Sequence, residues 1–157
     1  MEYSTIEELI NLARENEMTV SEVVIQSEIE ESEKNRDEIV DRMRETFEVM
    51  KEAVEEGKNK QEKSPSGLSG GDAYKLSHFD DFLGNNIYKK VMTYAVATSE
   101  VNASMGKIVA GPTAGSSGIV PAVLLAVGEK IKADDEDIIK ALFTASGLGM
   151  VVSKKAT

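Results

Sequence analysis

The stretch Asn102–Pro121 reads Asn-Ala-Ser-Met-Gly-Lys-Ile-Val-Ala-Gly-Pro-Thr-Ala-Gly-Ser-Ser-Gly-Ile-Val-Pro and lies between two apolar segments of helical period. It contains four glycines, two prolines and a run of Ala, Ser and Thr, so few of its side chains are bulky. Glycine loses much backbone entropy on folding, and its concentration therefore indicates a positive φ or a close approach of backbone. Two interpretations are open: a tight connection where two helices cross closely, or a cradle of main-chain N–H groups for a small ligand.

Charge and glycine are distributed unevenly along the 157 residues. Residues 1–63 carry 19 acidic and 9 basic side chains, whereas residues 64–157 carry 9 of each. Gly57 is the only glycine before residue 67, and eleven follow it. We therefore expect an acidic helical arm over residues 1–63 and a helical core with glycine-rich loops over residues 64–157. The acidic balance argues against nucleic acid, which is bound by clusters of Lys and Arg.

Composition excludes several other classes of site. The chain contains no cysteine, which excludes disulfides and Cys-ligated metals within it, and its single histidine argues against a zinc or haem site. No run approaches the ~20 apolar residues of a membrane span, and the N-terminus does not have the pattern of a signal peptide. We expect a cytoplasmic protein that does not bind membranes.

Two helices are expected in the acidic arm. Ser4–Glu7 and Thr19–Glu22 both have the spacing of a capping box. The first predicts a short helix to about residue 15, and the second a long helix that reaches about residue 56 and is ended by Gly57. The apolar stripe of the long helix lapses into charge between residues 30 and 38, so the helix is expected to be solvated or bent there.

The part from residue 64 onward is also expected to be helical, which makes the chain all-α. No segment shows the alternation of a strand. Helices are predicted at about 72–83, 87–105, from 116 or 117 onward, and 136–152, with Asp72, Ser116 or Ser117, and Asp134 or Asp135 as N-caps. The last helix is apolar around nearly its whole circumference, which predicts burial on all sides, and hence a further chain or a further part of this polypeptide beside it.

A second glycine-rich stretch, Ser66–Ala73, precedes the helix at residue 72. The exposed N–H groups of a first helical turn suit a carboxylate or phosphate, and Lys75 is placed to reach back to such an anion. A flexible loop before a capped helix is the alternative. Glu100 and Asn102, polar residues near a buried helix end, are expected to be either satisfied structural groups or site residues. A serine nucleophile is not expected, because His78 is the only histidine available as a base.

The two stretches Ser66–Leu76 and Glu100–Ile119 together closely resemble the α subunit, or α domain, of the iron–sulfur-dependent L-serine dehydratases (L-serine ammonia-lyases) of bacteria. The short and then long acidic helices at the N-terminus are also similar. The resemblance implies a lyase that converts L-serine to pyruvate and ammonia with a [4Fe–4S] cluster, one iron of which acts as a Lewis acid on the substrate hydroxyl.

The resemblance also implies which residues line the serine site. They are Ser66, Gly67, Ser69, Gly70, Gly71, Asp72, Lys75, Asn102, Pro112, Thr113, Ala114 and Gly115, with the last four nearest the substrate. A crevice of backbone amides at helix starts suits a small carboxylate such as L-serine. The proton-abstracting base is not implied by any residue pattern.

This sequence departs from the family in two respects. The family's cluster-ligating cysteines follow the position where this chain ends. The family's β subunit or β domain is also lacking. We therefore expect an N-terminal portion of the α subunit that binds no cluster and has no dehydratase activity alone, and that associates into a homo- or hetero-oligomer. The alternative is a non-catalytic helical interaction module or a small-anion-binding module.

Overall fold

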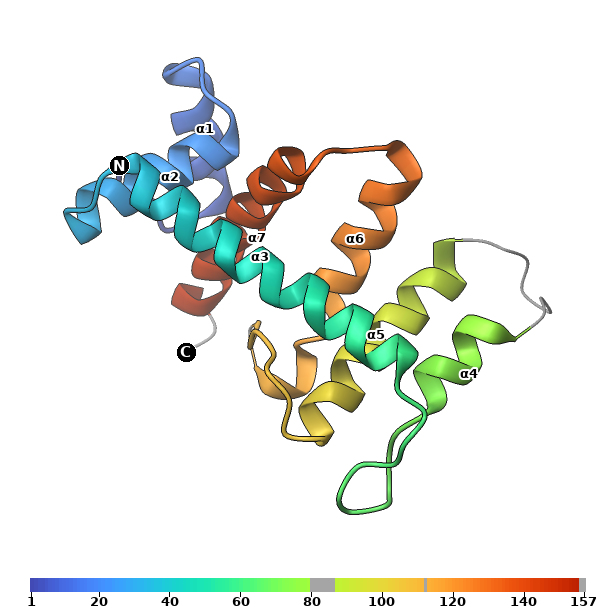
Figure 1. Cartoon of the computed structure of the whole chain (residues 1–157). Helices are drawn as coiled ribbons and strands as arrows, with labels where there is room; N and C mark the ends of the chain where they lie inside the picture. Colours follow the sequence, from blue (N-terminus) through green and yellow to red (C-terminus); the bar gives the residue numbers. More distant parts are fainter. Residues whose placement is uncertain (80–86, 112, 156–157) are drawn as a thin grey trace. The chain divides into compact units, whose positions relative to one another are not determined.

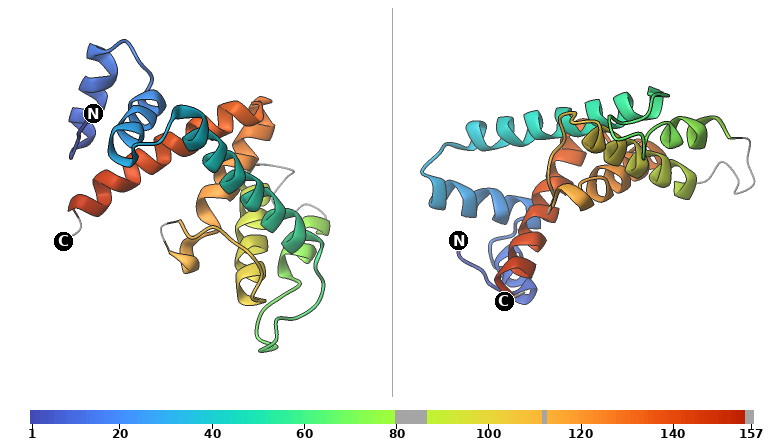
Figure 2. Two further views of the ribbon diagram at one scale, coloured as in Figure 1. Left: turned by 60° about the vertical axis from the view of Figure 1, so that its left-hand side comes forward. Right: turned by 90° about the horizontal axis from the view of Figure 1, so that it is seen from below.

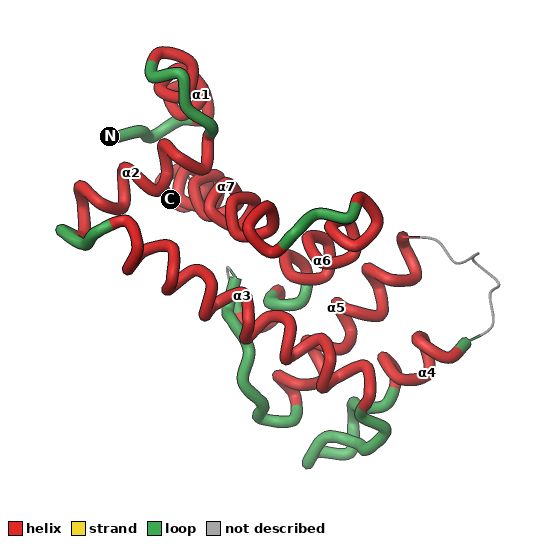
Figure 3. The backbone as a smooth tube through the Cα atoms, turned by 45° about the horizontal axis from the view of Figure 1, so that its top comes forward, coloured by secondary structure: helices red, strands yellow, loops and turns green. Residues whose placement is uncertain are grey.

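The computed structural model describes residues 1–79, 87–111 and 113–155. Within these residues the chain is built from α-helices and one short 3₁₀ helix, with no strand (Figures 1 and 3). The expectation of an all-α fold is confirmed. The elements in chain order are α1 (Ile6–Glu15), α2 (Val20–Ser32), α3 (Arg36–Asn59), α4 (Asp72–His78), α5 (Ile87–Ala103), η1 (Ala114–Ser116), α6 (Ile119–Ile131) and α7 (Asp135–Lys155).

The chain forms two compact units. The first contains residues 1–45 and 134–157, and the second contains residues 46–133, so that α3 contributes to both. The boundary expected after residue 63 rests on charge and glycine content, whereas these units rest on packing.

In the first unit α7 lies along α2, and α1 packs beside them (Figure 2). Leu9, Val23 and Ile139, one from each helix, are buried in its core. Gly147 of α7 permits the close approach, because a Cβ there would overlap a methyl group of Val24 and lie 3.3 Å from the Tyr3 hydroxyl. A larger residue at this position would force the helices apart.

The first helix begins with a capping box, one residue later than expected. Thr5 is the N-cap, and its hydroxyl accepts the Glu8 N–H at 3.1 Å. The Glu8 carboxylate accepts the N–H groups of Ser4 and Thr5 in return. These bonds lower the pKa of Glu8, the backbone hydrogen bond from Ser4 most of all. The predicted start of the second helix is confirmed, since Thr19 is the N-cap of α2 and its hydroxyl accepts the Glu22 N–H.

The long helix expected in the acidic arm is two helices, α2 and α3. Glu33 ends α2 in a left-handed conformation, with φ of 57°. Asn35 and Glu38 then exchange reciprocal backbone–side-chain hydrogen bonds of 3.0 Å, a capping box that starts α3. The break lies where the apolar stripe lapses, and residues 33–38 are exposed, so the segment is both solvated and interrupted.

The expectation that Gly57 ends this helix is wrong, because α3 continues to Asn59. Gly57 is buried, and a Cβ there would overlap the carbonyl oxygen of Ala97 in α5. This glycine therefore permits a close crossing of α3 and α5 within the second unit, and it does not serve as a helix terminator.

In the second unit α5 packs against both α4 and α6 (Figure 2). Its core contains Val54, Tyr94, Ala122 and Ala126. The residue before α6 is Gly118, which approaches α5 so closely that a Cβ would lie 2.5 Å from the Ala95 carbonyl oxygen.

The expected caps of α6, Ser116 and Ser117, are wrong. The N-cap is Gly118, without a side-chain hydrogen bond. The Ser117 hydroxyl donates at 2.7 Å to the Ala114 carbonyl oxygen of η1, which takes it away from the first turn of α6.

The predictions for α4 and α7 are met in part. The described part of α4 ends at His78, and the remainder of the expected 72–83 helix lies largely outside the described residues. Asp134 caps α7 as predicted, accepting the Asp137 N–H at 2.9 Å. However, α7 is not buried on all sides, since Leu148 is 38% and Val152 61% exposed.

One segment of the described chain, residues 114–131, is long and apolar enough by length and composition to cross a membrane. It combines η1 with α6, and a third of it is buried inside the fold. Core helices of soluble proteins pass the same test, so this is weak evidence of a span. The expectation of no membrane contact stays a prediction.

Candidate functional site

Glu100, in the last turn of α5, holds the glycine-rich loop that precedes α4. This loop, residues 66–71, is called the first loop from here on. This side chain is only 5% exposed, and its carboxylate accepts the N–H of Asp72 at 2.8 Å and the N–H of Ala73 at 3.4 Å. Both donors belong to the first turn of α4, directly after the loop. A buried carboxylate requires such donors, and hydrogen bonds to a charged acceptor are stronger than neutral ones.

The same end of α5 holds, through Asn102, the glycine-rich loop that precedes α6. This loop, residues 104–118, is called the second loop from here on. Its side-chain amide donates at 3.2 Å to the Ala114 carbonyl oxygen in η1. Figure 1 shows the end of α5 with the loop before α4 on one side and the loop before α6 on the other. The structure thus brings both predicted loops to one helix end.

The two anchors point to different sides of that helix. At about 100° per residue, Glu100 and Asn102 are about 160° apart around α5. Ala95, Val96 and Ser99 lie in the arc between them. Together with Ser69, Asp72 and Glu100, these three residues line a hollow of about 300 Å³. The hollow therefore lies along the arc of α5 between the two loop anchors.

Serine side chains organise the first loop from within. Ser64 is buried, donates its N–H to the Ser69 carbonyl at 2.7 Å, and accepts the Gly67 N–H on its own carbonyl at 2.8 Å. Its hydroxyl lies 3.0 Å from the Ser66 hydroxyl and 3.2 Å from that of Ser69. The hydroxyls of Ser66 and Ser69 thus have partners inside the loop.

Two glycines of this loop are required by its fold. Gly70 and Gly71 have φ of +117° and +81°, which side chains rarely adopt. A Cβ at Gly70 would lie 2.5 Å from the Glu62 carbonyl oxygen, and one at Gly71 would lie 2.7 Å from that of Gln61. Gly67 also has a positive φ, of +72°, but its surroundings are open. The loop doubles back closely on the segment that enters it.

Lys75 does reach back over the first turn of α4, to Asp72. Its Nζ lies 2.9 Å from Asp72 Oδ1. This hydrogen bond lowers the pKa of the Asp72 carboxyl and raises that of Lys75. Both side chains are mostly exposed, so the pair contributes little to stability.

Residues 113–115 of the second loop are exposed. Thr113 caps η1, since its hydroxyl accepts the Ser116 N–H at 3.3 Å and the Ser116 hydroxyl accepts the Thr113 N–H at the same distance. Ala114 is held through its carbonyl by Asn102. Pro112, the remaining residue of the predicted set, lies outside the described residues.

One expectation about the first loop is corrected by this geometry. The first-turn amides of α4 were expected to receive a ligand carboxylate, but they already carry the carboxylate of Glu100. Asp72 is not the N-cap of α4, which is Gly71. The two acids on the lining of the hollow already have partners, since Asp72 pairs with Lys75 and Glu100 accepts the two amides of α4.

Glu100, which anchors the first loop, is absent from the predicted set of site residues. It is the only acidic residue in α5, and the sequence marks it as a polar group that needs partners. The signal that identifies it is an acid within an apolar helix. Nothing in the local sequence indicates that its donors lie 27 and 28 residues earlier.

The residues of this chain do not fit an iron–sulfur cluster. Cysteine is absent from the sequence, and in the part of the chain that the structure describes no group of three or more His, Cys, Asp or Glu side chains is placed to hold a metal ion. His78 is exposed, and its Nδ1 lies 2.9 Å from the Tyr74 carbonyl oxygen.

A polar network outside the hollow joins α5 to α6. The Tyr94 hydroxyl donates to one oxygen of Glu129 at 2.7 Å, and Lys90 donates to the other at 2.6 Å. Burial raises the pKa of Tyr94, and the hydrogen bond to Glu129 raises it further. This network lies nearer the N-terminal half of α5 and contains none of the predicted site residues.

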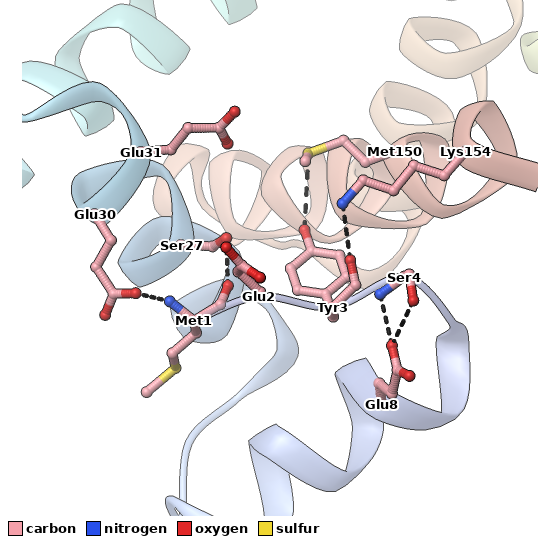
Figure 4. A pocket seen from close by; sticks show the side chains of 10 residues that line it. All are labelled: Met1, Glu2, Tyr3, Ser4, Glu8, Ser27, Glu30, Glu31, Met150 and Lys154. Atoms are coloured by element: carbon pink, nitrogen blue, oxygen red, sulfur yellow. Dashed lines mark hydrogen bonds and ion pairs between the residues drawn. The ribbon is translucent and has the colours of Figure 1, made fainter.

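The first unit has a larger cavity, of about 650 Å³, that also contains no predicted site residue (Figure 4). Its wall includes the N-terminus and side chains of α1, α2 and α7. The Met1 ammonium pairs with Glu30, Lys154 donates to the Tyr3 carbonyl at 2.9 Å, and Ser27 donates to the Met1 carbonyl at 2.7 Å. Its polar groups are thus largely paired with one another.

Comparisons with known proteins identify relatives over nearly the whole chain. Residues 15–157 match the family model described as "Serine dehydratase alpha chain". A probable L-serine dehydratase alpha chain of Bacillus subtilis is 40% identical over 99% of this chain and 52% of its own length. The L-serine dehydratase alpha chain of Peptoniphilus asaccharolyticus is 34% identical over 98% of this chain and 54% of its own length.

An L-serine dehydratase of Streptomyces coelicolor is 30% identical over 99% of this chain and 35% of its own length. No solved structure matches. The chain spans about half the length of the first two of these relatives.

Proposed function

Because the chain belongs to the serine dehydratase alpha chain family, we propose that it supplies part of the substrate site of an L-serine dehydratase, which converts L-serine to pyruvate and ammonia. One observation of the structure carries the proposal. Both glycine-rich loops are anchored at one end of α5, and the first of them lines, with α5, a hollow of about 300 Å³. Small-molecule sites are concave and have few polar groups, and this volume is at the small end of their range.

The lining of the hollow supports a particular orientation of the substrate. The α-ammonium group of serine is placed at the exposed carboxylate of Asp72, which it would share with Lys75, and the hydroxyl of Ser99 is a further polar group on the lining. The carboxylate end is placed toward the exposed residues 113–115 of the second loop, which do not themselves line the hollow. This reverses the assignment expected from the sequence, because the amides of α4 are occupied by Glu100.

The same occupancy weighs against a small-anion-binding module. Such a module would offer free first-turn amides to its ligand, but two of those of α4 are already bonded to a carboxylate of the chain itself.

We further propose that the cluster and the β subunit or β domain belong to parts of the enzyme outside these 157 residues. A [4Fe–4S] cluster supplies Lewis-acid chemistry, and nearly all such clusters are held by thiolates, which this chain lacks. The role of this chain is then to bind and orient L-serine. No proton transfer is assigned to its side chains, and its location in the cytoplasm stays a prediction.

The test compares the isolated chain with the complete enzyme of the source organism, both treated anaerobically with ferrous iron and sulfide. We expect the complete enzyme to form pyruvate from L-serine, and the isolated chain to show neither cluster absorbance nor pyruvate. A complete enzyme that forms no pyruvate would refute the function. A cluster on the isolated chain would refute the division of roles.

A further inference from the structure

We propose that Glu100 is a positioning residue, which holds the first glycine-rich loop in the conformation that faces the hollow and thereby sets the affinity for the substrate. The positioning of the loop is a property of this chain itself. The effect on substrate affinity rests on the proposed function.

The need for Glu100 arises from Gly71. A helix is commonly capped by the side chain of its N-cap residue, but Gly71 has none. Its φ of +81° and the 2.7 Å that would separate a Cβ from the Gln61 carbonyl oxygen exclude a side chain at this position. Glu100, which comes from a neighbouring helix, supplies the missing acceptor to Asp72 and Ala73.

The burial of Glu100 makes this arrangement specific. At 5% exposure its carboxylate has little access to water, so its charge is compensated mainly by the two amides. Ser99, on the adjacent position of α5, is exposed and donates to the Ala95 carbonyl of its own helix at 2.9 Å. Only Glu100 of these two side chains connects α5 to α4.

Glu100→Gln is the informative substitution because it preserves shape. Glutamine offers one oxygen acceptor and one NH₂ donor, so the NH₂ group would face a backbone N–H that needs an acceptor. We expect the loop to detach more often while the remainder of the second unit stays folded. Glu129→Gln is the matched control, since it removes a carboxylate from the same unit at the distant Tyr94 network.

Amide hydrogen exchange of the whole chain, resolved by NMR, tests the positioning role. In Glu100→Gln we expect the Asp72 and Ala73 amides to exchange about 10- to 100-fold faster, the loss expected for a charged hydrogen bond. Exchange in α6 should stay unchanged, and Glu129→Gln should leave both α4 amides protected. Unchanged exchange at these amides in Glu100→Gln would overturn the proposal. If the Gln variant does not fold, Glu100→Asp takes its place, because it keeps the charge on a shorter side chain. Exchange of the Asp72 and Ala73 amides is then measured in that variant.

Steady-state kinetics of the complete enzyme test the consequence for the substrate. We expect Glu100→Gln to raise KM for L-serine about tenfold or more, with kcat within about twofold of the parent enzyme. A purely structural role would lower the yield of active enzyme and leave KM unchanged. Faster exchange with an unchanged KM would overturn the link to substrate affinity. An inactive parent enzyme would instead refute the proposed function, while the exchange result would still decide the positioning role.

Discussion

Replacing Gly57 by alanine tests whether the crossing of α3 and α5 is as close as the structure shows. An ideal Cβ at this position would overlap the carbonyl oxygen, the carbonyl carbon and the Cα of Ala97. All three are backbone atoms of α5, which cannot rotate away as a side chain can. The substitution must therefore separate the two helices that position the candidate site.

The expected magnitude is the difference between two opposing terms. Alanine is favoured over glycine in a helix interior by about 1 kcal/mol. Overpacking costs about 1–3 kcal/mol, and contact with rigid backbone places Gly57→Ala at the upper end of that range. We therefore expect a net loss of about 2 kcal/mol of unfolding free energy, which corresponds to a melting temperature lower by about 4–8 °C.

Urea denaturation followed by circular dichroism at the helical band measures this loss. The control is Gly149→Ala in α7, where no described atom lies within 4 Å of the new Cβ. The control should be stabilised by up to about 1 kcal/mol, because only the helix propensity changes. A Gly57→Ala variant as stable as the parent protein, or more stable, would refute the close crossing.

Three further perturbations have defined outcomes. Asp134→Ala removes the cap of α7 and should cost about 1 kcal/mol of unfolding free energy, which chemical denaturation would detect; no loss would contradict the cap. Arg36 donates to both oxygens of the Glu22 carboxylate and lowers the pKa of that carboxyl. The pair therefore stabilises the fold above the unfolded pKa of Glu22, near 4.5, and this contribution disappears as the pH falls through the lower folded pKa. Glu22→Gln should thus cost about 0.5 kcal/mol at pH 7 and nothing in strong acid, and a penalty independent of pH would argue against the pair. Asn102→Ala should accelerate amide exchange at residues 113–117 about tenfold and leave α4 protected, whereas acceleration in α4 alone would contradict the separate anchoring of the two loops.

The helical fold could be predicted from local patterns because its signals are local. Thr19 and Asp134 cap helices by bonding residues three positions later, a spacing visible in the sequence. The break at Glu33 follows from the lapse of the apolar stripe. These features depend on neighbours within one helical turn.

Features that depend on distant segments could not be predicted in the same way. Gly57 has the pattern of a helix terminator, yet its role is set by Ala97, forty positions later. The start of α1, by contrast, is a local feature, and it could be placed only to within one residue because Ser4–Glu7 and Thr5–Glu8 both have the spacing of a capping box.

The candidate site was predicted as two loops, and the structure supports their association with one helix end. The use of the α4 amides by Glu100 was not predictable, because a buried acid reveals that it needs a donor but does not reveal which one. The Glu100 carboxylate thus occupies two amides that the sequence pattern predicts for a ligand anion.

The most direct test of serine binding between these loops is the KM for L-serine of the complete enzyme carrying Gly115→Ala. The described atom nearest to a Cβ at this exposed position is the Thr113 hydroxyl oxygen, at 3.9 Å, so the chain itself tolerates the methyl group. If the substrate carboxylate lies against residues 113–115, the added methyl group occupies its space, and KM should rise about tenfold or more with unchanged thermal stability. An unchanged KM would contradict the placement of L-serine at these loops.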